Sequence, residues 1–338
     1  MNDKITLAHG AGGKQTSELI GGLFKKYFDN PNLTADDAAV LTPPAGRMAM
    51  STDGFIVSPA FFPGGNIGKL SICGTVNDLA CMGAKPLYIS CACVIEEGFP
   101  MDTLEEIVKS MAETAAKVGV QIVSGDTKVA GKGQVDGIFI TTTGVGEIMP
   151  KAELSGAYAR PGDAIIVTGD VGRHGCTILL ERDRYGMEAE VTSDCAPLWH
   201  PVRDLIQKIP EVHVIRDATR GGVGTVLYEI ADESKVGIRL DAESVPVCDE
   251  VRGVTGMLGL EPLYLACEGR MVIFVPKEKA EDAVRILREA SPDTAGAAII
   301  GEVSAARPER GSKVFLRTAF GGTRILDMLV GEQLPRIC

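Results

Sequence analysis

The stretch that decides the fold runs from Ile67 to Ile95 and reads IGKLSICGTVNDLACMGAKPLYISCACVI. Its first part, 67–82, has helical character and is mostly apolar, which predicts a buried helix. Residues 87–95 form an apolar run that predicts a strand, with Cys91 and Cys93 on one face as small core residues. A buried helix followed by a strand is typical of a mixed α/β fold.

Helix and strand signals continue on both sides of this stretch. In the first half we expect helices over 15–28 and 104–118, and strands over 47–52, 120–124 and 138–145. In the second half we expect helices over 176–182, 222–233 and 280–290, and strands over 164–168, 213–216, 271–275, 298–303 and 313–317.

A boundary is expected near residues 150–162, PKAELSGAYARPG, which are rich in Pro and Gly and separate two periodic regions. Pro335 would stop a helix near the end of the chain. We therefore predict an α+β (mixed α/β) fold of two domains, 1–152 and 153–329, followed by a flexible tail over 330–338.

The composition is that of a globular protein, with 338 residues, 45% hydrophobic and 23% charged. The net charge of −11 argues against a nucleic acid or an anionic membrane surface as the main partner. Nine cysteines, an odd number with no C-x-x-C spacing, fit neither a disulfide framework nor a zinc site. With no signal peptide or membrane span visible, we expect a cytoplasmic protein.

Aspartates recur in short motifs that we expect at strand or helix ends: Asp37 in ADDAAV, Asp53 in STDG, Asp78 beside Asn77 in VNDLA, and Asp126 in SGDTK. Mg²⁺ prefers one or two carboxylates together with phosphate and water, so such a set is what an ATP–Mg²⁺ site needs. Any single Asp is more simply explained by a turn or a helix cap, so the case for a site rests on the set. Asp78 argues most strongly for a site because its helix is otherwise apolar.

Possible phosphate donors lie in two segments of the first half. The motif HGAGGK ends with Gly12, Gly13 and Lys14, just before a predicted helix. Its backbone N–H groups could hold a phosphate, although a plain turn explains these residues equally well. Lys128 follows Thr127 and could contact a phosphate or a reacting oxygen, or simply be a surface lysine on a hairpin.

Three further candidates lie in the second half. Arg220, in RDATRGG with Asp217, could form an anion site at a helix start, although an N-cap explains the acidic residue there. Glu268 in ACEGR could act as a base if burial raises its pKa, whereas a turn carboxylate paired with Arg270 is the simpler reading. His174 in GRHG is either an acid–base group or a loop residue.

Cys338, the last residue of the sequence, is a possible working thiol on a mobile arm. Such a thiol could receive a group in one site and present it in another, since the thiolate is the nucleophile. The alternative is an incidental last residue.

These motifs together resemble the HypE family, the carbamoyl dehydratases of [NiFe]-hydrogenase maturation. The resemblance spans nearly the whole chain, and it is carried by LAHGAGG (7–13), STDGFIVSPAFFPGGNIGKL (51–70), GTVNDLA (74–80), SGDTKV (124–129), RDATRGG (216–222) and LPRIC (334–338). It implies a PurM-like, AIR-synthetase-like architecture, with an N-terminal ATP-binding and dimerisation domain, a second PurM-like domain and a homodimer.

The resemblance also implies a reaction. A HypF-type carbamoyltransferase would place a carbamoyl group on Cys338, and ATP with Mg²⁺ would activate the carbamoyl oxygen so that water is eliminated. The resulting cyanide would pass to iron on a HypC–HypD scaffold complex. The residues implied to bind ATP–Mg²⁺ are Asp37, Asp53, Asn77, Asp78, Asp126, Thr127, Gly12, Gly13, Lys14 and Arg220, the four Asp of this set being the metal ligands. Those implied at the reacting group are Lys128, Glu268 as base, and His174.

One position departs from the wider superfamily, which often has Gly before the paired aspartates where this chain has Ala35. Two other functions remain open on the sequence. An ATP-dependent synthetase or kinase acting on a free small molecule would keep its turnover after Cys338→Ala. A non-enzymatic docking protein for maturation would show no ATP hydrolysis.

Overall fold

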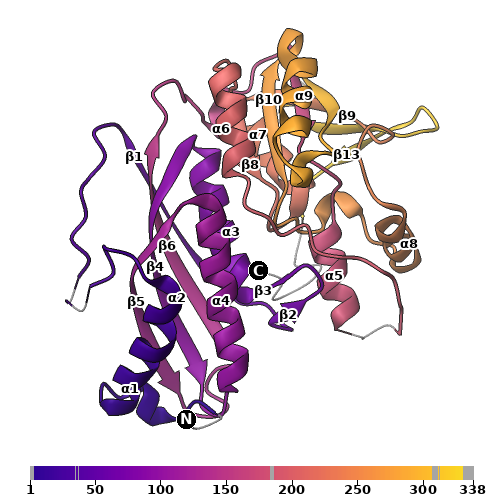
Figure 1. The fold of residues 1–338 in the computed structure, drawn as a ribbon. Coiled ribbons are helices and arrows are strands. Elements are labelled where there is room, and N and C mark those ends of the chain that lie inside the picture. The colour runs from indigo at the N-terminus through magenta and orange to yellow at the C-terminus, as the bar shows by residue number, and fades with distance from the viewer. Residues whose placement is uncertain are drawn as a thin grey trace.

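The computed structural model describes residues 4–34, 36, 38–182, 186–306, 311 and 313–329. These residues form two α/β domains, each built on its own sheet, which lie against one another (Figure 1). The first sheet ends with β6 at Ile148 and the second begins with β7 at Asp163.

The N-terminal domain is a four-stranded sheet in the order β1-β6-β4-β5, formed by β1 (Met48–Phe55), β4 (Ala84–Glu96), β5 (Gln121–Ala130) and β6 (Ile138–Ile148). Helices α3 (Ile67–Cys81) and α4 (Met101–Val118) pack together on one face of this sheet (Figure 1). Helix α3 is buried nearly all round, as its apolar sequence predicts, and Asn66 caps it by accepting from the N–H groups of Gly68 and Lys69.

The two faces of this sheet have different environments. Cys91 and Cys93 are buried on the helix-covered face with their Sγ atoms 3.8 Å apart, which confirms the expectation that they share a face in the core. On the opposite face Met48 and Met50 are 56% and 68% exposed. The second face is therefore open within a single chain.

The remaining elements of the first half surround this sheet. They are the 3-10 turn η1 (Leu7–Gly10), α1 (Lys14–Leu19), the π-helical turn η2 (Ile20–Phe24), α2 (Lys25–Phe28), and the hairpin of β2 (Phe61–Phe62) and β3 (Gly65–Asn66). Leu19, Leu23 and Phe28 enter the core, so the predicted helix over 15–28 exists but contains a π turn.

The C-terminal domain is a seven-stranded sheet in the order β13-β12-β9-β11-β7-β10-β8. Its strands are β7 (Asp163–Val167), β8 (Val214–Asp217), β9 (Val236–Asp241), β10 (Met271–Pro276), β11 (Ala298–Ala305), β12 (Val314–Arg317) and β13 (Thr323–Leu326). Its helices and 3-10 turns are η3 (Gly156–Tyr158), α5 (Arg173–Glu181), α6 (Trp199–Lys208), α7 (Gly222–Ser234), α8 (Asp249–Leu258), η4 (Pro262–Tyr264), η5 (Lys277–Lys279), α9 (Ala280–Ala290) and η6 (Pro292–Thr294).

Among the α-helices and strands of this domain, four have no counterpart among the expected ones: α6, β9, α8 and β13. Strand β5 also continues to Ala130, through the acidic motif expected to lie at its end, because it pairs in parallel with β4 as far as Ala130. Asp53 likewise lies inside β1 and Asp78 inside α3, so the prediction that these acids stand at element ends was wrong.

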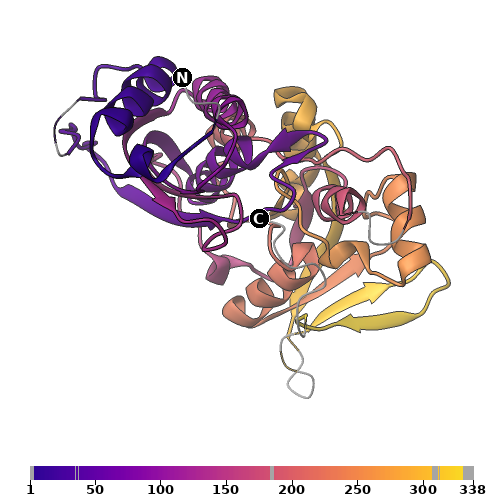
Figure 2. The ribbon, with the colours of Figure 1, turned by 90° about the horizontal axis from the view of Figure 1, so that it is seen from below.

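The two domains share a hydrophobic core. One cluster of buried residues joins Ile107 of α4 to Ile206 of α6 and Val284 of α9. Helix α3 contacts both α6 and β8, and therefore lies between the first sheet and the second domain (Figures 1 and 2). None of the described helices combines the length and apolarity that crossing a membrane requires.

Candidate active site

Carboxylates from both domains converge where α3 meets β1 and β8. Asp78 of α3 accepts a hydrogen bond from the hydroxyl of Ser51 on β1. The close approach of the two elements depends on Gly74, since a Cβ there would lie 2.7 Å from the Phe55 ring and 3.9 Å from Oδ2 of Asp53. The glycine of GTVND thus lets Asp53 and Asp78 face one another.

The second domain adds Asp217, the last residue of β8, and Glu268, which precedes β10. We refer to Asp53, Asp78, Asp217 and Glu268 as the carboxylate junction. Burial first, and then the charge of Asp217, raises the pKa of Asp78 to about 7, against the opposing hydrogen bond from Ser51. Burial likewise raises the pKa of Asp217. The junction therefore favours a bound proton or cation.

Glu268 is the most buried member of the junction, with 2% of its surface exposed. Its Oε1 atom has no hydrogen-bond partner among the described residues. Burial raises the pKa of Glu268 well above its usual range, and the nearby Cys195 and Asp194 raise it further. A buried carboxyl group with a raised pKa holds a proton more tightly than an exposed one and can act as a general base toward a bound group.

The junction suits a cation that is held mainly by other ligands. Within the described residues, no three His, Cys, Asp or Glu side chains are arranged to hold a metal ion by themselves. Mg²⁺ usually takes one or two carboxylates and completes its shell with phosphate and water. The mutual repulsion that raises the pKa of Asp78 would be relieved by such an ion, so the residues present fit Mg²⁺ carried by a nucleotide.

A second candidate region lies at the β5 edge of the first sheet. A cavity of about 480 Å³ opens there between α1, η2 and β5, and Asp36, Asp126 and Thr127 are among its lining residues. Lys128 forms an ion pair with Asp126 at 3.1 Å, and the two side chains are 66% and 58% exposed. We call this cavity, with Asp126 and Lys128, the edge pocket.

Strand register shows that the two regions are separate in one chain. Asp126 pairs with Ala92, Ala92 with Thr141, and Thr141 with Gly54, so Asp126 shares a row with Gly54 rather than with Asp53. Adjacent residues of a strand point to opposite faces, and three strand spacings amount to roughly 14 Å. One chain therefore brings Asp53 and Asp78 together with Glu268, but not with Asp126, Thr127 or Lys128.

The glycine-rich turn lies beside the edge pocket. Gly12 has φ +82° and donates its N–H to the Thr16 hydroxyl, and a Cβ at Gly12 or Gly13 would meet nothing within 4 Å. Lys14 is solvent-exposed and pairs with Glu18 at 3.6 Å. The turn is thus open on its outer side, while Thr16 itself lines the edge pocket.

Three predicted residues have other surroundings. His174 is completely buried at the start of α5, where its Nδ1 lies 2.8 Å from the Ser193 hydroxyl and its ring meets Phe62 edge-on. Arg220 is exposed just before α7. Asn77 is buried, and its side-chain amide bonds to backbone groups of the second domain. None of these placements puts the side chain at the centre of the junction.

Asp37 and Cys338 lie outside the described residues, as does Ala35. Two residues were not predicted at this place, Asp217 of the junction and Ser51, which donates to Asp78. The sequence indicated Asp217 only as part of an anion site, and Ser51 was not a candidate. An acid at the carboxyl end of a buried strand, as in VIRDA, is the signal that could have identified Asp217.

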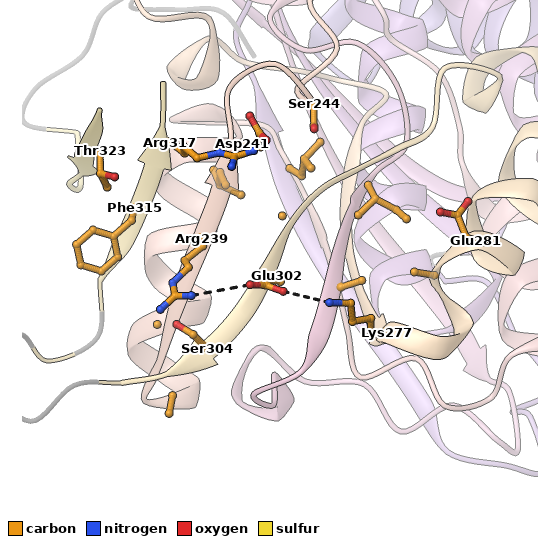
Figure 3. Close-up of a pocket in the computed structure, with 18 of the residues that line it drawn as sticks. Arg239, Asp241, Ser244, Lys277, Glu281, Glu302, Ser304, Phe315, Arg317 and Thr323 are labelled. Carbon is orange, nitrogen blue, oxygen red and sulfur yellow. Dashed lines mark hydrogen bonds and ion pairs between the residues drawn. The ribbon is translucent and has the colours of Figure 1, made fainter. Parts of the chain in front are cut away.

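A further cavity, of about 800 Å³, lies over β9, β11 and β12 of the second sheet (Figure 3). Its charged residues neutralise one another, since Glu302 pairs with both Arg239 and Lys277, and Arg317 pairs with Asp241. Among the described residues, none of the predicted site residues lines it. The junction and the edge pocket therefore remain the regions that combine a cavity or burial with the predicted chemistry.

Family models match both domains of the chain. Residues 35–148 match the AIR synthase related protein N-terminal domain, and residues 160–312 match the AIR synthase related protein C-terminal domain. The fold is therefore PurM-like, with two AIR-synthetase-type domains.

Individual relatives cover almost the whole chain. The carbamoyl dehydratase HypE of Rhodobacter capsulatus is 47% identical, over 100% of this chain and 99% of its own length. A crystal structure of the hydrogenase maturation protein HypE in complex with ATP superposes with a TM-score of 0.94 at 47% identity, covering 98% of this chain and 99% of that one. HypE in a HypE–HypF complex gives a TM-score of 0.80 at 43% identity, covering 92% and 99%. The chain belongs to the HypE family of carbamoyl dehydratases.

Proposed function

We propose that this chain is an ATP-dependent carbamoyl dehydratase that converts an S-carbamoyl group on Cys338 into a thiocyanate and so supplies cyanide for the iron of [NiFe]-hydrogenase. The observation that carries the proposal is the junction: a buried glutamate with an unpartnered oxygen, set among aspartates of both domains. The relatives named carbamoyl dehydratase and the ATP complex of a HypE at 47% identity support it.

The reaction needs phosphorylation of the carbamoyl oxygen and removal of the N–H protons, and the residues of the junction could assist both steps. The carbamoyl oxygen attacks the γ-phosphorus of ATP and releases ADP, which turns a poor leaving group into phosphate. The nitrogen loses one N–H proton when the carbamoyl oxygen is phosphorylated and the second when phosphate leaves and the C≡N bond forms, so that overall S–C(=O)–NH₂ and ATP give S–C≡N, ADP and phosphate. Glu268 would take the second of these protons, because burial raises its pKa and so makes its carboxylate a stronger base than an exposed glutamate.

The nucleotide would be held by carboxylates through Mg²⁺. Asp53 and Asp78 are the members of the junction that would contact the metal, with Asp37 and Asp126 as further ligands. Mg²⁺ would supply charge neutralisation at the phosphates. Thr127, Arg220 and the turn of Gly12, Gly13 and Lys14 would contribute polar contacts to the nucleotide.

A homodimer would bring the two separate regions together. The open face of the first sheet exposes Met48 and Met50, and Asp126 and Lys128 point to that same face. If two copies pair through these faces, the edge pocket of one can approach the junction of the other. Lys128 of one copy would then reach the reacting group beside Glu268 of the second.

The proposed partners follow from the tethered substrate. A HypF-type carbamoyltransferase would load Cys338, consistent with a solved complex of a related HypE with HypF. A HypC–HypD complex would accept the cyanide. We propose a cytoplasmic location for the reaction, where its co-substrate ATP is supplied.

Intact-protein mass spectrometry tests the proposal. The full chain is incubated with a HypF-type carbamoyltransferase and carbamoyl phosphate, and Mg-ATP is added afterwards. We expect an adduct on the C-terminal peptide that loses the mass of one water only when ATP is present. An adduct on another residue, or one that keeps its water with ATP, would contradict the proposal.

A further inference from the structure

Asn77 connects the two domains beside the junction. Its side chain is 3% exposed, on α3, one residue before Asp78. The amide nitrogen donates to the carbonyl oxygen of Ala196 at 3.0 Å, and the amide oxygen accepts from the N–H of Leu198 at 2.8 Å. The same nitrogen lies 3.4 Å from the carbonyl oxygen of Glu268. One side chain of the first domain therefore holds two segments of the second.

The backbone around Glu268 is also held from within its own domain. The N–H of Gly269 donates to Asp194 at 2.9 Å, and the N–H of Cys267 donates to the carbonyl of Ala218 at 2.9 Å. Gly269 cannot carry a side chain, because a Cβ there would lie 1.9 Å from the carbonyl oxygen of Asp194. The peptide groups on both sides of Glu268 are thus fixed, and among the described residues the hydrogen bond from Asn77 ties this segment to α3.

The position of the Glu268 carboxyl group depends on this backbone. Its Oε1 has no hydrogen-bond partner among the described residues, so no hydrogen bond on that atom fixes where the carboxyl points. Asn77 and Asp78 are consecutive on α3, and their side chains diverge by about 100° around the helix axis. Asn77 therefore contacts the second domain, whereas Asp78 contacts β1.

We infer that Asn77 is a positioning residue, which sets the Glu268 segment of the second domain relative to Asp78 and the first domain, rather than a nucleotide ligand. This inference rests on the proposed function, because it assigns Glu268 as the base. Loss of the Asn77 side chain would leave ATP binding intact, and it would move Glu268, the base, away from the proton that it removes. A misplacement of about 1 Å lowers a catalysed rate by as much as about 10²-fold.

The test compares Asn77→Ala with Asn66→Ala in the full chain carbamoylated at Cys338. Asn66 is a matched control, since it is a buried Asn at the N-cap of the same helix, and among the described residues its side chain bonds to N–H groups of the first turn of α3. The measurements are the rate of water loss at saturating Mg-ATP, the KM for ATP, and the ATP consumed per water lost. Thermal unfolding shows whether each variant is folded.

We expect Asn77→Ala to lower the rate of water loss about 10- to 100-fold, with the KM for ATP within about twofold and more ATP consumed per water lost. Asn66→Ala should stay within about threefold of the wild type, because it loses only a cap. If the alanine variant does not fold, Asn77→Asp keeps the acceptor for Leu198 and removes the donors, and the same pattern is expected.

Two results would overturn the inference. A raised KM for ATP with an unchanged maximal rate would make Asn77 a nucleotide ligand, and equal effects of the two Asn variants would make it only structural. Failure of the wild-type chain to lose water would instead contradict the proposed function, so the two ideas fail separately.

Discussion

The carboxylate junction and the edge pocket use the same residue types in opposite environments. At the junction, burial raises the pKa of Asp78 to about 7, and Glu268 is almost fully enclosed. At the edge pocket, Asp126 and Lys128 are 58% and 66% exposed and pair with each other. The buried junction, where a pKa is raised, therefore suits proton and charge chemistry, whereas the charges of the edge pocket are accessible from outside the chain.

The first test of this contrast removes the base. We expect Glu268→Gln to lower the rate of ATP-dependent water loss by about 10²- to 10⁴-fold, because the amide cannot accept the N–H proton. Measurement of water loss by intact mass, with ATP affinity measured in parallel, checks this. Glu302→Gln, at the cavity over the second sheet, is the control and should retain the wild-type rate. An active Glu268→Gln protein would remove Glu268 from the mechanism.

The second test asks whether the two regions meet only between copies of the chain. Lys128→Ala and Glu268→Gln should each be nearly inactive alone. If the edge pocket of one copy completes the junction of the other, mixing the two variants restores about a quarter of the wild-type activity, because half of the dimers are mixed and each has one intact site. Both variants and the mixture are assayed at equal total concentration. If the site lies within one chain, mixing restores nothing.

The third test uses the pH dependence of stability. The folded pKa of Asp78, about 7, lies above its usual value of 3.8, so the native state binds more protons between these values. The stabilisation of the folded state that comes from the raised pKa of Asp78 is therefore fully present below pH 3.8, and it is lost as the pH rises toward 7. In metal-free buffer, Asp78→Asn should raise the free energy of unfolding at pH 8 by about 1–3 kcal/mol.

Denaturant unfolding of the wild type and of Asp78→Asn between pH 5 and 8 makes this measurement. The wild type should lose stability across that range, and the variant should lose less. A wild-type curve that rises with pH would show that Asp78 is not held in a charge-repelling site. The same variant should lose ATP-dependent turnover, because a neutral amide is a poor Mg²⁺ ligand.

The smallest effect is expected at the edge pocket. Asp126→Asn should change the free energy of unfolding by less than about 1 kcal/mol, since exposed ion pairs contribute little. Its difference from the wild type should also show little dependence on pH between 5 and 8, in contrast to Asp78→Asn. Denaturant unfolding in the same buffers gives the comparison. An effect on stability as large as that of Asp78→Asn would show that the two regions are not distinct in their energetics.

The sequence named Asp53, Asp78 and Glu268 as candidates from their short motifs, and these three residues lie together at the junction, while their roles stay predictions. Asp217 and Ser51 could not be assigned there, since their roles come from contacts with α3 rather than from their neighbours in the chain. The resemblance implied that Asn77 binds ATP–Mg²⁺, and only its three-dimensional contacts show that it links the domains.

By itself, the sequence determined the two-domain α/β pattern and the burial of α3, because hydrophobic periodicity is a local property that a helix or strand must satisfy. Only the tertiary structure decided which carboxylates share a site. Strand register places Asp53 and Asp126 on opposite faces and opposite edges of one sheet, although both stand in similar short motifs. The physical reason is that register and domain packing depend on contacts between residues far apart in the chain, which no local pattern encodes.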